Sequence, residues 1–206
     1  MPAAAPVPPE KAVFLNVPFD PSYEPLFLAL IASLVSIGRA PRCVLEIPET
    51  GQGRLGRLMG LIESCRVSIH DLSRVGAPAR FNMPFELGLA YSLRLQRLTP
   101  RQHVIIVLEA QRHRLSRTLS DLAGYDPGIH EGKPRRMISA VLDSLSTPAD
   151  GPYPDQVYRM WLRLMKDARR LRRLEQAPNV FSRVLFGRTV IAATELAAKD
   201  RLIRRR

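Results

Sequence analysis

Strand-length apolar runs alternate with apolar residues at helical spacing along the first half of the chain. The strand-length runs are residues 12–19, 42–48, 67–72 and 103–109. The helical stretches between them are residues 26–35, 55–62 and 81–98. Asp20 and Pro21 are typical of a helix start, and Gly38 is typical of a helix end. This alternation predicts right-handed βαβ units and a mostly parallel sheet with helices on both faces.

Beyond residue 109 the pattern becomes helical. Helices are predicted over residues 112–123, 132–146, 154–176 and 179–203. Prolines and a glycine between residues 147 and 154 mark the best linker candidate. We therefore predict a disordered, Ala/Pro-rich start over residues 1–11, an α/β domain over residues 12–147 and a C-terminal helical extension over residues 154–206.

Composition describes a globular protein, since 46% of the 206 residues are apolar and 24% are charged. The sequence contains neither an export signal nor 18 consecutive apolar residues, so a cytoplasmic location is expected. Cys43 and Cys65 are too few for a disulfide framework and lie in no Cys/His cluster. They are expected to be small buried residues, with no metal site.

Positive charge is concentrated at the C-terminal end. The net charge is +12, and residues 151–206 hold 14 Lys/Arg against 5 Asp/Glu. A cationic helical segment suits a nucleic acid, an anionic membrane surface or an acidic protein partner. The alternatives are a solvated helix face, or helices that pack onto the domain or a second subunit while their arginines reach solvent.

Polar residues follow the predicted strands at the edge where parallel sheets bind ligands. They are Asn16 and Asp20 after the first strand, residues 49–54 after the second, and His70, Asp71, Ser73 and Arg74 at the third. A carboxylate such as Asp71 is either a loop anchor or a ligand contact. His70 is expected to be a structural histidine, because no serine or cysteine nucleophile is identifiable beside it.

The strongest anomaly is Glu86. Asn82 is a plausible N-cap and Pro84 falls in the first helical turn. Glu86 then shares a helical stripe with Leu89, Ala90 and Leu93, which turns a carboxylate toward the sheet. Burial would raise the pKa of this acid into the range useful for acid/base chemistry. The alternative is a structural glutamate, satisfied by loop amides or by Arg80.

Several of these segments resemble known families. Cys65-Arg-Val-Ser-Ile-His-Asp-Leu-Ser73, with Glu86-Leu-Gly-Leu-Ala90 after it, resembles the D-L-S and E-x-G-x-A pattern of nucleoside deoxyribosyltransferase-like proteins. Val13-Phe-Leu-Asn-Val-Pro-Phe-Asp20 is similar to the first strand and loop of TIR (Toll/interleukin-1 receptor) domains. Together with Phe81-Asn-Met-Pro-Phe-Glu86 and Asp121-Leu-Ala-Gly-Tyr-Asp126, the set resembles a bacterial TIR-like group. This resemblance implies a flavodoxin-like three-layer α/β fold with a mostly parallel sheet of four to five strands.

The resemblance implies chemistry at an N-glycosidic bond. In both families the glutamate that matches Glu86 acts there, as the nucleophile of the transferases or as the essential acid of TIR enzymes that split NAD. The implied substrate-binding residues are Asn16, Phe19, Asp20, Arg54, Asp71, Ser73 and Asn82. Residues 51–53 with Arg54 would close over phosphates. No cofactor is implied, because NAD would be the substrate.

The chain departs from the TIR pattern, since Met83-Pro-Phe85 replaces the aromatic-Cys pair before the glutamate. Two functions therefore remain open. One is an NAD(P)+ nucleosidase or related N-glycosidase that works as a homo-oligomer in antiphage defence. The other is a non-catalytic nucleotide-sensing or protein-interaction module with a basic helical tail. Asp126 and His130 are further candidates for the site, although a turn is the default for Asp126-Pro-Gly128.

Overall fold

The structure, a computed structural model, describes residues 7–47, 53–73, 81–96, 103–122, 124–147 and 151–203. Its centre is a five-stranded sheet in the order β2-β1-β3-β4-β5, in which every pairing is parallel. The strands are β1 (Ala12–Asn16), β2 (Ala40–Cys43), β3 (Val67–Asp71), β4 (Val104–Glu109) and β5 (Gly128–Ile129). This order is that of flavodoxin-like folds, so the predicted fold class is confirmed.

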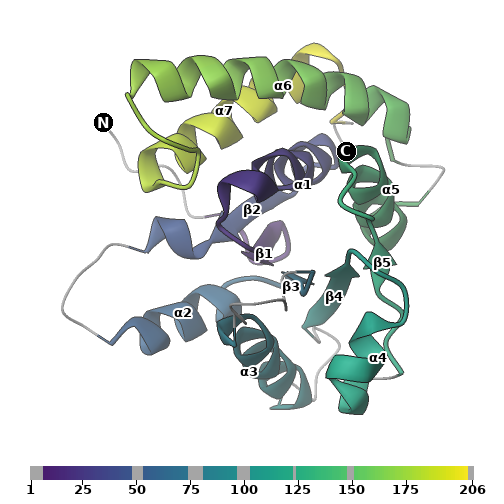
Figure 1. Ribbon diagram of the computed structural model, residues 1–206. Coiled ribbons are helices and arrows are strands. Elements are labelled where there is room, and N and C mark those ends of the chain that lie inside the picture. Colours follow the sequence, from purple (N-terminus) through teal and green to yellow (C-terminus); the bar gives the residue numbers. More distant parts are fainter. Residues whose placement is uncertain are drawn as a thin grey trace.

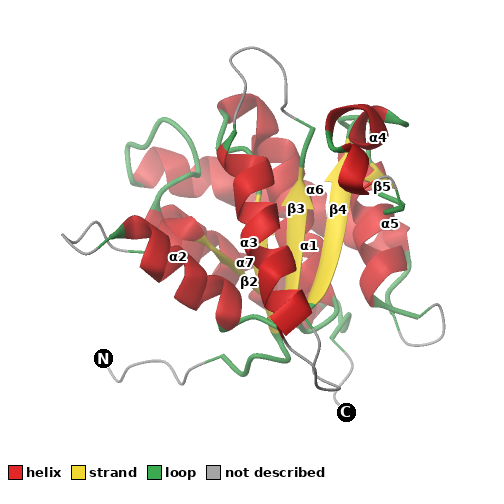
Figure 2. Ribbon diagram, turned by 90° about the horizontal axis from the view of Figure 1, so that it is seen from below, coloured by secondary structure: helices red, strands yellow, loops and turns green. Residues whose placement is uncertain are grey.

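Helices cover both faces of the sheet (Figures 1 and 2). They are α1 (Glu24–Ser36), α2 (Arg54–Glu63), α3 (Asn82–Gln96), α4 (Arg114–Thr118), α5 (Pro134–Leu145), α6 (Pro154–Leu174) and α7 (Arg183–Lys199). Short 3-10 helices are η1 (Pro21–Tyr23), η2 (Val44–Glu46) and η3 (Ser120–Leu122). One hydrophobic cluster joins the sheet to α1, α5, α6 and α7, and a second joins it to α2, α3 and α4.

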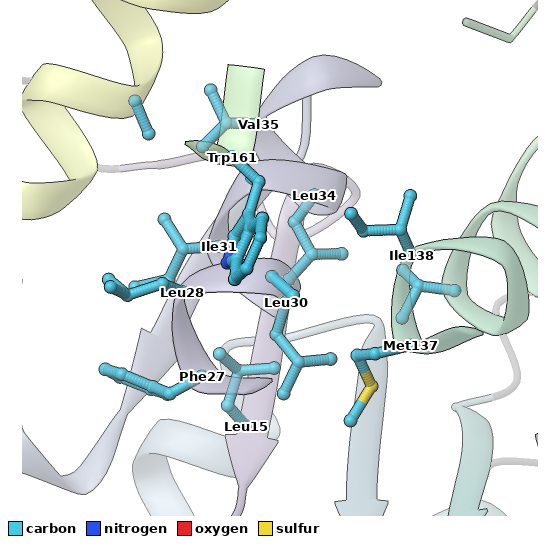
Figure 3. Close-up of a cluster of buried hydrophobic side chains, with 14 of the residues drawn as sticks. Leu15, Phe27, Leu28, Leu30, Ile31, Leu34, Val35, Met137, Ile138 and Trp161 are labelled. Carbon is cyan, nitrogen blue, oxygen red and sulfur yellow. The ribbon is translucent and has the colours of Figure 1, made fainter. Parts of the chain in front are cut away.

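Helix α1 lies at the centre of the larger cluster. Every residue of α1 except Pro25 is buried, because the sheet covers one side and α5, α6 and α7 cover the others. Figure 3 shows side chains of β1, α1, α5 and α6 meeting around this helix. A helix that is apolar all round can only be stable in such surroundings.

The C-terminal helices form an additional layer outside α1 (Figure 1). The inner face of α6 is apolar and buried; it consists of Val157, Met160, Trp161, Leu164 and Ala168. The Trp161 indole Nε1 donates a hydrogen bond to the Pro25 carbonyl oxygen at 3.0 Å. Arg172 lies 3.3 Å from the buried carboxylate of Glu24. The basic segment therefore packs onto the α/β domain, which was one of its predicted alternatives.

Two boundaries differ from the sequence prediction. The second strand begins at Ala40 and ends at Cys43, because the Glu46 carboxylate accepts hydrogen bonds from the Cys43 backbone N–H and from Arg42. These bonds fold residues 44–46 into η2 instead of extending the strand. The helix predicted over residues 112–123 is broken, with α4 and η3 in its place.

Strand β5 replaces part of the turn expected at residues 126–128. Gly128 pairs with Leu108 of β4, and a Cβ atom at Gly128 would lie 2.8 Å from Leu108 Cδ2 and 3.1 Å from Ala140 Cβ. A larger residue would have to displace the Leu108 side chain and would crowd Ala140, so glycine suits the close approach of the edge strand to β4 and α5. The glycine that indicates a turn in the sequence therefore favours close packing here.

Backbone hydrogen bonds also fix the end of α1 and the segment before β1. Gly38 ends α1 with a φ of 70°, and its N–H donates to the Val35 carbonyl oxygen, as predicted. The Pro9 and Lys11 carbonyl oxygens accept bonds from Arg66 and Ala40, so this part of the predicted disordered start is held against the sheet. Among the described residues, no helix combines the length and apolar character needed to cross a membrane.

We expect Trp161→Ala to lower the free energy of unfolding by about 3–5 kcal/mol, because it opens a cavity over α1 and removes the bond to Pro25. Leu162→Ala is the matched control, since Leu162 is the next residue of α6 and is exposed; its effect should stay within about 0.5 kcal/mol. Chemical denaturation measures both. Equal effects would show that α6 does not stabilise the domain.

Candidate active site

The carboxyl ends of β1 and β3 form the topological switch point of the sheet. These strands are neighbours, but the chain leaves β1 toward α1 on one face and leaves β3 toward α3 on the other. Ligands of doubly wound sheets bind at such a point. Asn16 ends β1 and is paired with His70 of β3, so both lie where a site is expected.

Asn16 connects this strand end to the helix that carries Glu86. Its amide Nδ2 donates to the Met83 carbonyl oxygen at 2.9 Å and to the His70 Nδ1 at 3.0 Å. Met83 lies in the first turn of α3, one turn before Glu86. Asn16 is buried and both its donors are used, so it positions α3 rather than offering its amide donors to a ligand.

A chain of buried polar groups continues from His70 across the sheet. His70 Nε2 lies 2.9 Å from Ser68 Oγ, which lies 2.8 Å from His103 Nε2, and His103 Nδ1 lies 3.1 Å from the Cys65 carbonyl oxygen. One assignment of hydrogen positions satisfies all of these polar atoms. His103 donates to the Cys65 carbonyl oxygen, and the Ser68 hydroxyl links the two neutral imidazole rings. Burial, together with nearby His103, lowers the pKa of His70 to about 3. His70 is thus the structural histidine expected from the sequence.

Asp71 lies on the opposite face of the sheet from this network. Side chains alternate along a strand, and the Asp71 carboxylate turns toward the α1 side, where it accepts bonds from the Tyr23 hydroxyl and the Ser73 backbone N–H. His130 Nε2 lies 3.1 Å from it. Burial alone would raise the pKa of Asp71, but the donors from His130, Ser73 and Tyr23 outweigh it and hold the pKa below its usual value.

The structure therefore does not bring Asp71 and Glu86 together. Asp71 is fully buried and its two oxygens are occupied by protein groups, which is the loop-anchor alternative and leaves no oxygen for a ribose hydroxyl. A second buried carboxylate, that of Glu109, lies at the end of β4. Arg114 binds it through two nitrogens and also donates to the Leu72 carbonyl oxygen at 2.8 Å. These bonds hold Leu72 and Ser73 directly after β3 and Ala110 directly after β4.

Glu86 differs from both anchors because none of the described residues donates a hydrogen bond to it. It is half-buried beside the buried stripe of Met83, Leu87 and Ala90, and it makes no hydrogen bond or ion pair within the part of the chain that the structure describes. Burial raises the pKa of Glu86 from 4.5 to about 7, and the charge of nearby Arg54 partly opposes this increase. A carboxyl group with this pKa can exchange a proton near neutral pH.

Arg54 and Asn82 lie on the same side of the sheet as Glu86. Arg54 is the exposed first residue of α2, and Asn82 is the exposed first residue of α3. The first helical bond of α3 runs from the Phe85 N–H to the Phe81 carbonyl oxygen, so Phe81, not Asn82, occupies the N-cap position. Phe81 and Phe85 are exposed over 79% and 54% of their surfaces and lie one turn apart at the start of α3.

The remaining predicted residues lie elsewhere. Phe19 packs against Phe27 and Phe181 on the α1 side, with ring centroids 6.1 and 5.6 Å away, so it does not form a wall of a site at Glu86. Asp20 is half-buried before η1, and Ser73 is half-buried and bonded through its N–H to Asp71. Arg74, Arg80 and residues 49–52 lie outside the described residues. Asp126 is exposed before β5.

Sequence reasoning missed several buried polar partners. Tyr23, Ser68, His103, Glu109 and Arg114 belong to the network or the anchors, and the role of His130 as a partner of Asp71 was not foreseen. One available signal was the polar pair Ser68 and His70, which period-two alternation places on one face of an otherwise apolar strand. Buried polar groups need partners, so the pair indicated a network.

The cysteines and possible metal ligands offer few other candidates for a functional site. Cys43 and Cys65 are buried and free, as expected, and burial raises the pKa of the Cys65 thiol to about 11. Over the described ranges, no group of three or more His, Cys, Asp and Glu side chains could hold a metal ion.

Comparisons of the chain with protein-family models, curated proteins and solved structures find no match.

We expect Asn16→Leu to lower the free energy of unfolding by about 1–3 kcal/mol, because it leaves His70 Nδ1 and the Met83 carbonyl oxygen buried without a donor. Asn82→Leu makes the same change at an exposed position of α3 and should have little effect. Denaturant unfolding of the two variants checks this. A smaller loss for Asn16→Leu than for Asn82→Leu would contradict the positioning role.

We expect Glu86→Gln to stabilise the fold in a pH-dependent way. Folding raises the Glu86 pKa to about 7, so the stability that the protonated acid contributes is complete below pH 4.5 and is lost as the pH rises through 7. Glutamine cannot ionise. The melting temperature of the variant should therefore exceed that of the wild type more at about pH 8 than at about pH 4. Glu195→Gln, at an exposed site on α7, is the control; an equal pH dependence in both would refute the desolvation of Glu86.

Proposed function

We propose that this chain is a TIR-like N-glycosidase that cleaves NAD or a related nucleotide between ribose and base, with Glu86 as its catalytic carboxylate. The observation that carries the proposal is the state of Glu86: half-buried on α3, one turn after the carbonyl that Asn16 binds, without a donor in the described part of the chain, and with a pKa raised to about 7. Structural carboxylates of the same edge, Asp71 and Glu109, are instead fully buried and bound by donors.

The proposed chemistry suits a single carboxylate in a desolvated position. Breaking an N-glycosidic bond builds positive charge on the sugar ring. The Glu86 carboxylate would stabilise this charge, or bond to the ribose C1′ as nicotinamide leaves, and a water molecule would then add at C1′ to complete the hydrolysis. Nicotinamide leaves NAD as a neutral base, so this reaction needs Glu86 ionised. In the free enzyme kcat/KM should then rise with pH through about 7.

The residues around Glu86 suit the other parts of a nucleotide. Arg54 opens α2, where its charge and the helix N-terminus would attract phosphates. Asn82 would bind ribose hydroxyls from the start of α3, and the exposed rings of Phe81 and Phe85 would stack on a base. Asn16 would act by holding the first turn of α3. A role in antiphage defence and a homo-oligomeric state rest on the TIR resemblance alone.

The alternative function is a nucleotide-sensing module in which Glu86 does no chemistry. Met83 is buried and bonded to Asn16 through its carbonyl oxygen, so this residue of the segment that departs from the TIR pattern contributes packing instead of a reactive group. In this case, the same phosphate and base contacts would bind a nucleotide without cleaving it. Truncation of residues 151–206 cannot test this function, because α6 and α7 cover α1.

We expect concentrated wild-type protein to release nicotinamide from NAD and Glu86→Gln to lose at least about 99% of this activity, while Glu195→Gln retains it. Nicotinamide would be quantified by chromatography, and a thermal-shift series with nucleotides would be run on the same samples. Equal turnover by wild type and Glu86→Gln would reject the catalytic assignment. A nucleotide-specific shift without turnover would establish the sensing module. The absence of both turnover and a thermal shift would reject both functions.

A further inference from the structure

The outer face of α6 carries a row of cations. Its members are Arg159, Lys166, Arg169, Arg170 and Arg173, and all five side chains are exposed. They recur at helical spacing on the side opposite the apolar face that packs on α1. At 1.5 Å per residue, this α6 cationic face is about 21 Å long. Figure 1 shows α6 at the outside of the molecule, so α1 and α7 leave this side uncovered.

Three acids near the α6 cationic face do not neutralise it, because arginines outside the face hold them. Asp155 pairs with Arg135 of α5 at 2.7 Å. Glu175 pairs with Arg188 of α7, and Asp200 pairs with Arg163. Within the described residues, none of the five cations of the face forms an ion pair. Asp167 is half-buried between them and likewise forms no ion pair there.

Two hollows lie along α6, one toward each end. The first, of about 470 Å³, is lined by Arg169, Arg172, Arg173, Gln176 and Ala177. The second, of about 450 Å³, is lined by Gln156, Arg159, Arg163, Asp200 and Leu202. The α6 cationic face contributes Arg169 and Arg173 to the first hollow and Arg159 to the second, so an anionic group can reach the face near both of its ends. A row of phosphates matches this arrangement better than one isolated anion does.

The packing of α6 decides between a membrane and a nucleic acid. Interfacial helices bury their apolar face in the lipid, but the apolar face of α6 is fixed against α1. Apart from Leu162 and Leu174, the outer side presents polar and charged groups. Nucleic-acid backbones carry closely spaced charges and are bound by arginine and lysine without insertion.

The aromatic residues of α6 favour a duplex over a single strand. Trp161 is buried, and Tyr158 stacks on it with ring centroids 5.1 Å apart beneath the Arg135 guanidinium. Neither ring is free to stack on an unpaired base, which is the main contact of single-strand binders. We propose that the α6 cationic face binds the phosphate backbone of double-stranded nucleic acid without reading its sequence.

The test uses the full chain and a fluorescent DNA duplex of about 20 base pairs, titrated at several salt concentrations. Five phosphate contacts predict a slope of log K against log salt of about −4.5. Two unrelated sequences should bind equally within about twofold. The triple variant Arg169→Glu, Arg170→Glu, Arg173→Glu should bind at least about tenfold more weakly, and its slope should be shallower by about 3.

The matched control makes the same change in net charge elsewhere, with Lys11→Glu, Arg66→Glu and Arg117→Glu at exposed positions away from α6. It should bind nearly as the wild type does. If the charge-reversed variant does not fold, as judged by circular dichroism, the three Arg→Gln changes replace it. Equal losses in test and control variants, a wild-type slope shallower than about −1, or tighter binding to the single strand would overturn the proposal. Binding to phosphatidylserine vesicles without duplex binding would overturn it in favour of a membrane.

Discussion

The burial of α1 is the constraint on which the rest of this structure depends. Its apolar residues extend around the whole helix, so the sheet can satisfy only one side of it. Helices α5, α6 and α7 supply the remaining cover, and the Trp161 indole and Arg172 bind the start of α1 at Pro25 and Glu24. The C-terminal third of the chain is thus part of the core that sets β1 and, through β1, the candidate site.

The candidate site follows from strand alternation and from hydrogen bonds that would be costly to lose. Asn16 and His70 face α3, whereas Asp71 faces α1, so one pair of neighbouring strands supplies two polar clusters that do not meet. On the α3 side, buried neutral groups hold the first turn of the helix through Met83. Glu86 is the acid left without such a partner in the described residues, and burial then raises its pKa.

Much of the fold was predictable because periodicity and helix boundaries are local. The alternation of strands and helices, Gly38 as the end of α1 and the position of Glu86 next to the buried stripe of α3 all follow from residue spacing. The sequence could not show that Glu46 would fold residues 44–46 into η2, because that choice depends on one side chain reaching back to Cys43. Strand β5 was missed because two residues carry no periodicity, and its glycine meets a steric requirement set by Leu108 and Ala140.

Residues of the site were harder to predict because partners distant in sequence decide each role. From the sequence, Asp71 could be either a loop anchor or a ligand contact. Its contacts with Tyr23 and His130, which are distant in sequence, show that it is an anchor. Phe19 is adjacent to the strand end in sequence, yet Phe27 and Phe181 hold its ring on the α1 side. Glu86 was identifiable because its local helix alone brings it beside the buried stripe.

Helix α6 also divides its own sequence into two sets of positions under different evolutionary pressure. Inward positions such as Val157, Met160 and Leu164 are fixed by packing against α1, so most changes there carry a stability cost. Outward positions such as Lys166, Arg169 and Arg170 are exposed and form no ion pair within the described residues, so folding alone constrains them little. If related chains nevertheless retain cations at the outward positions, stability is not the cause, and selection for a ligand is.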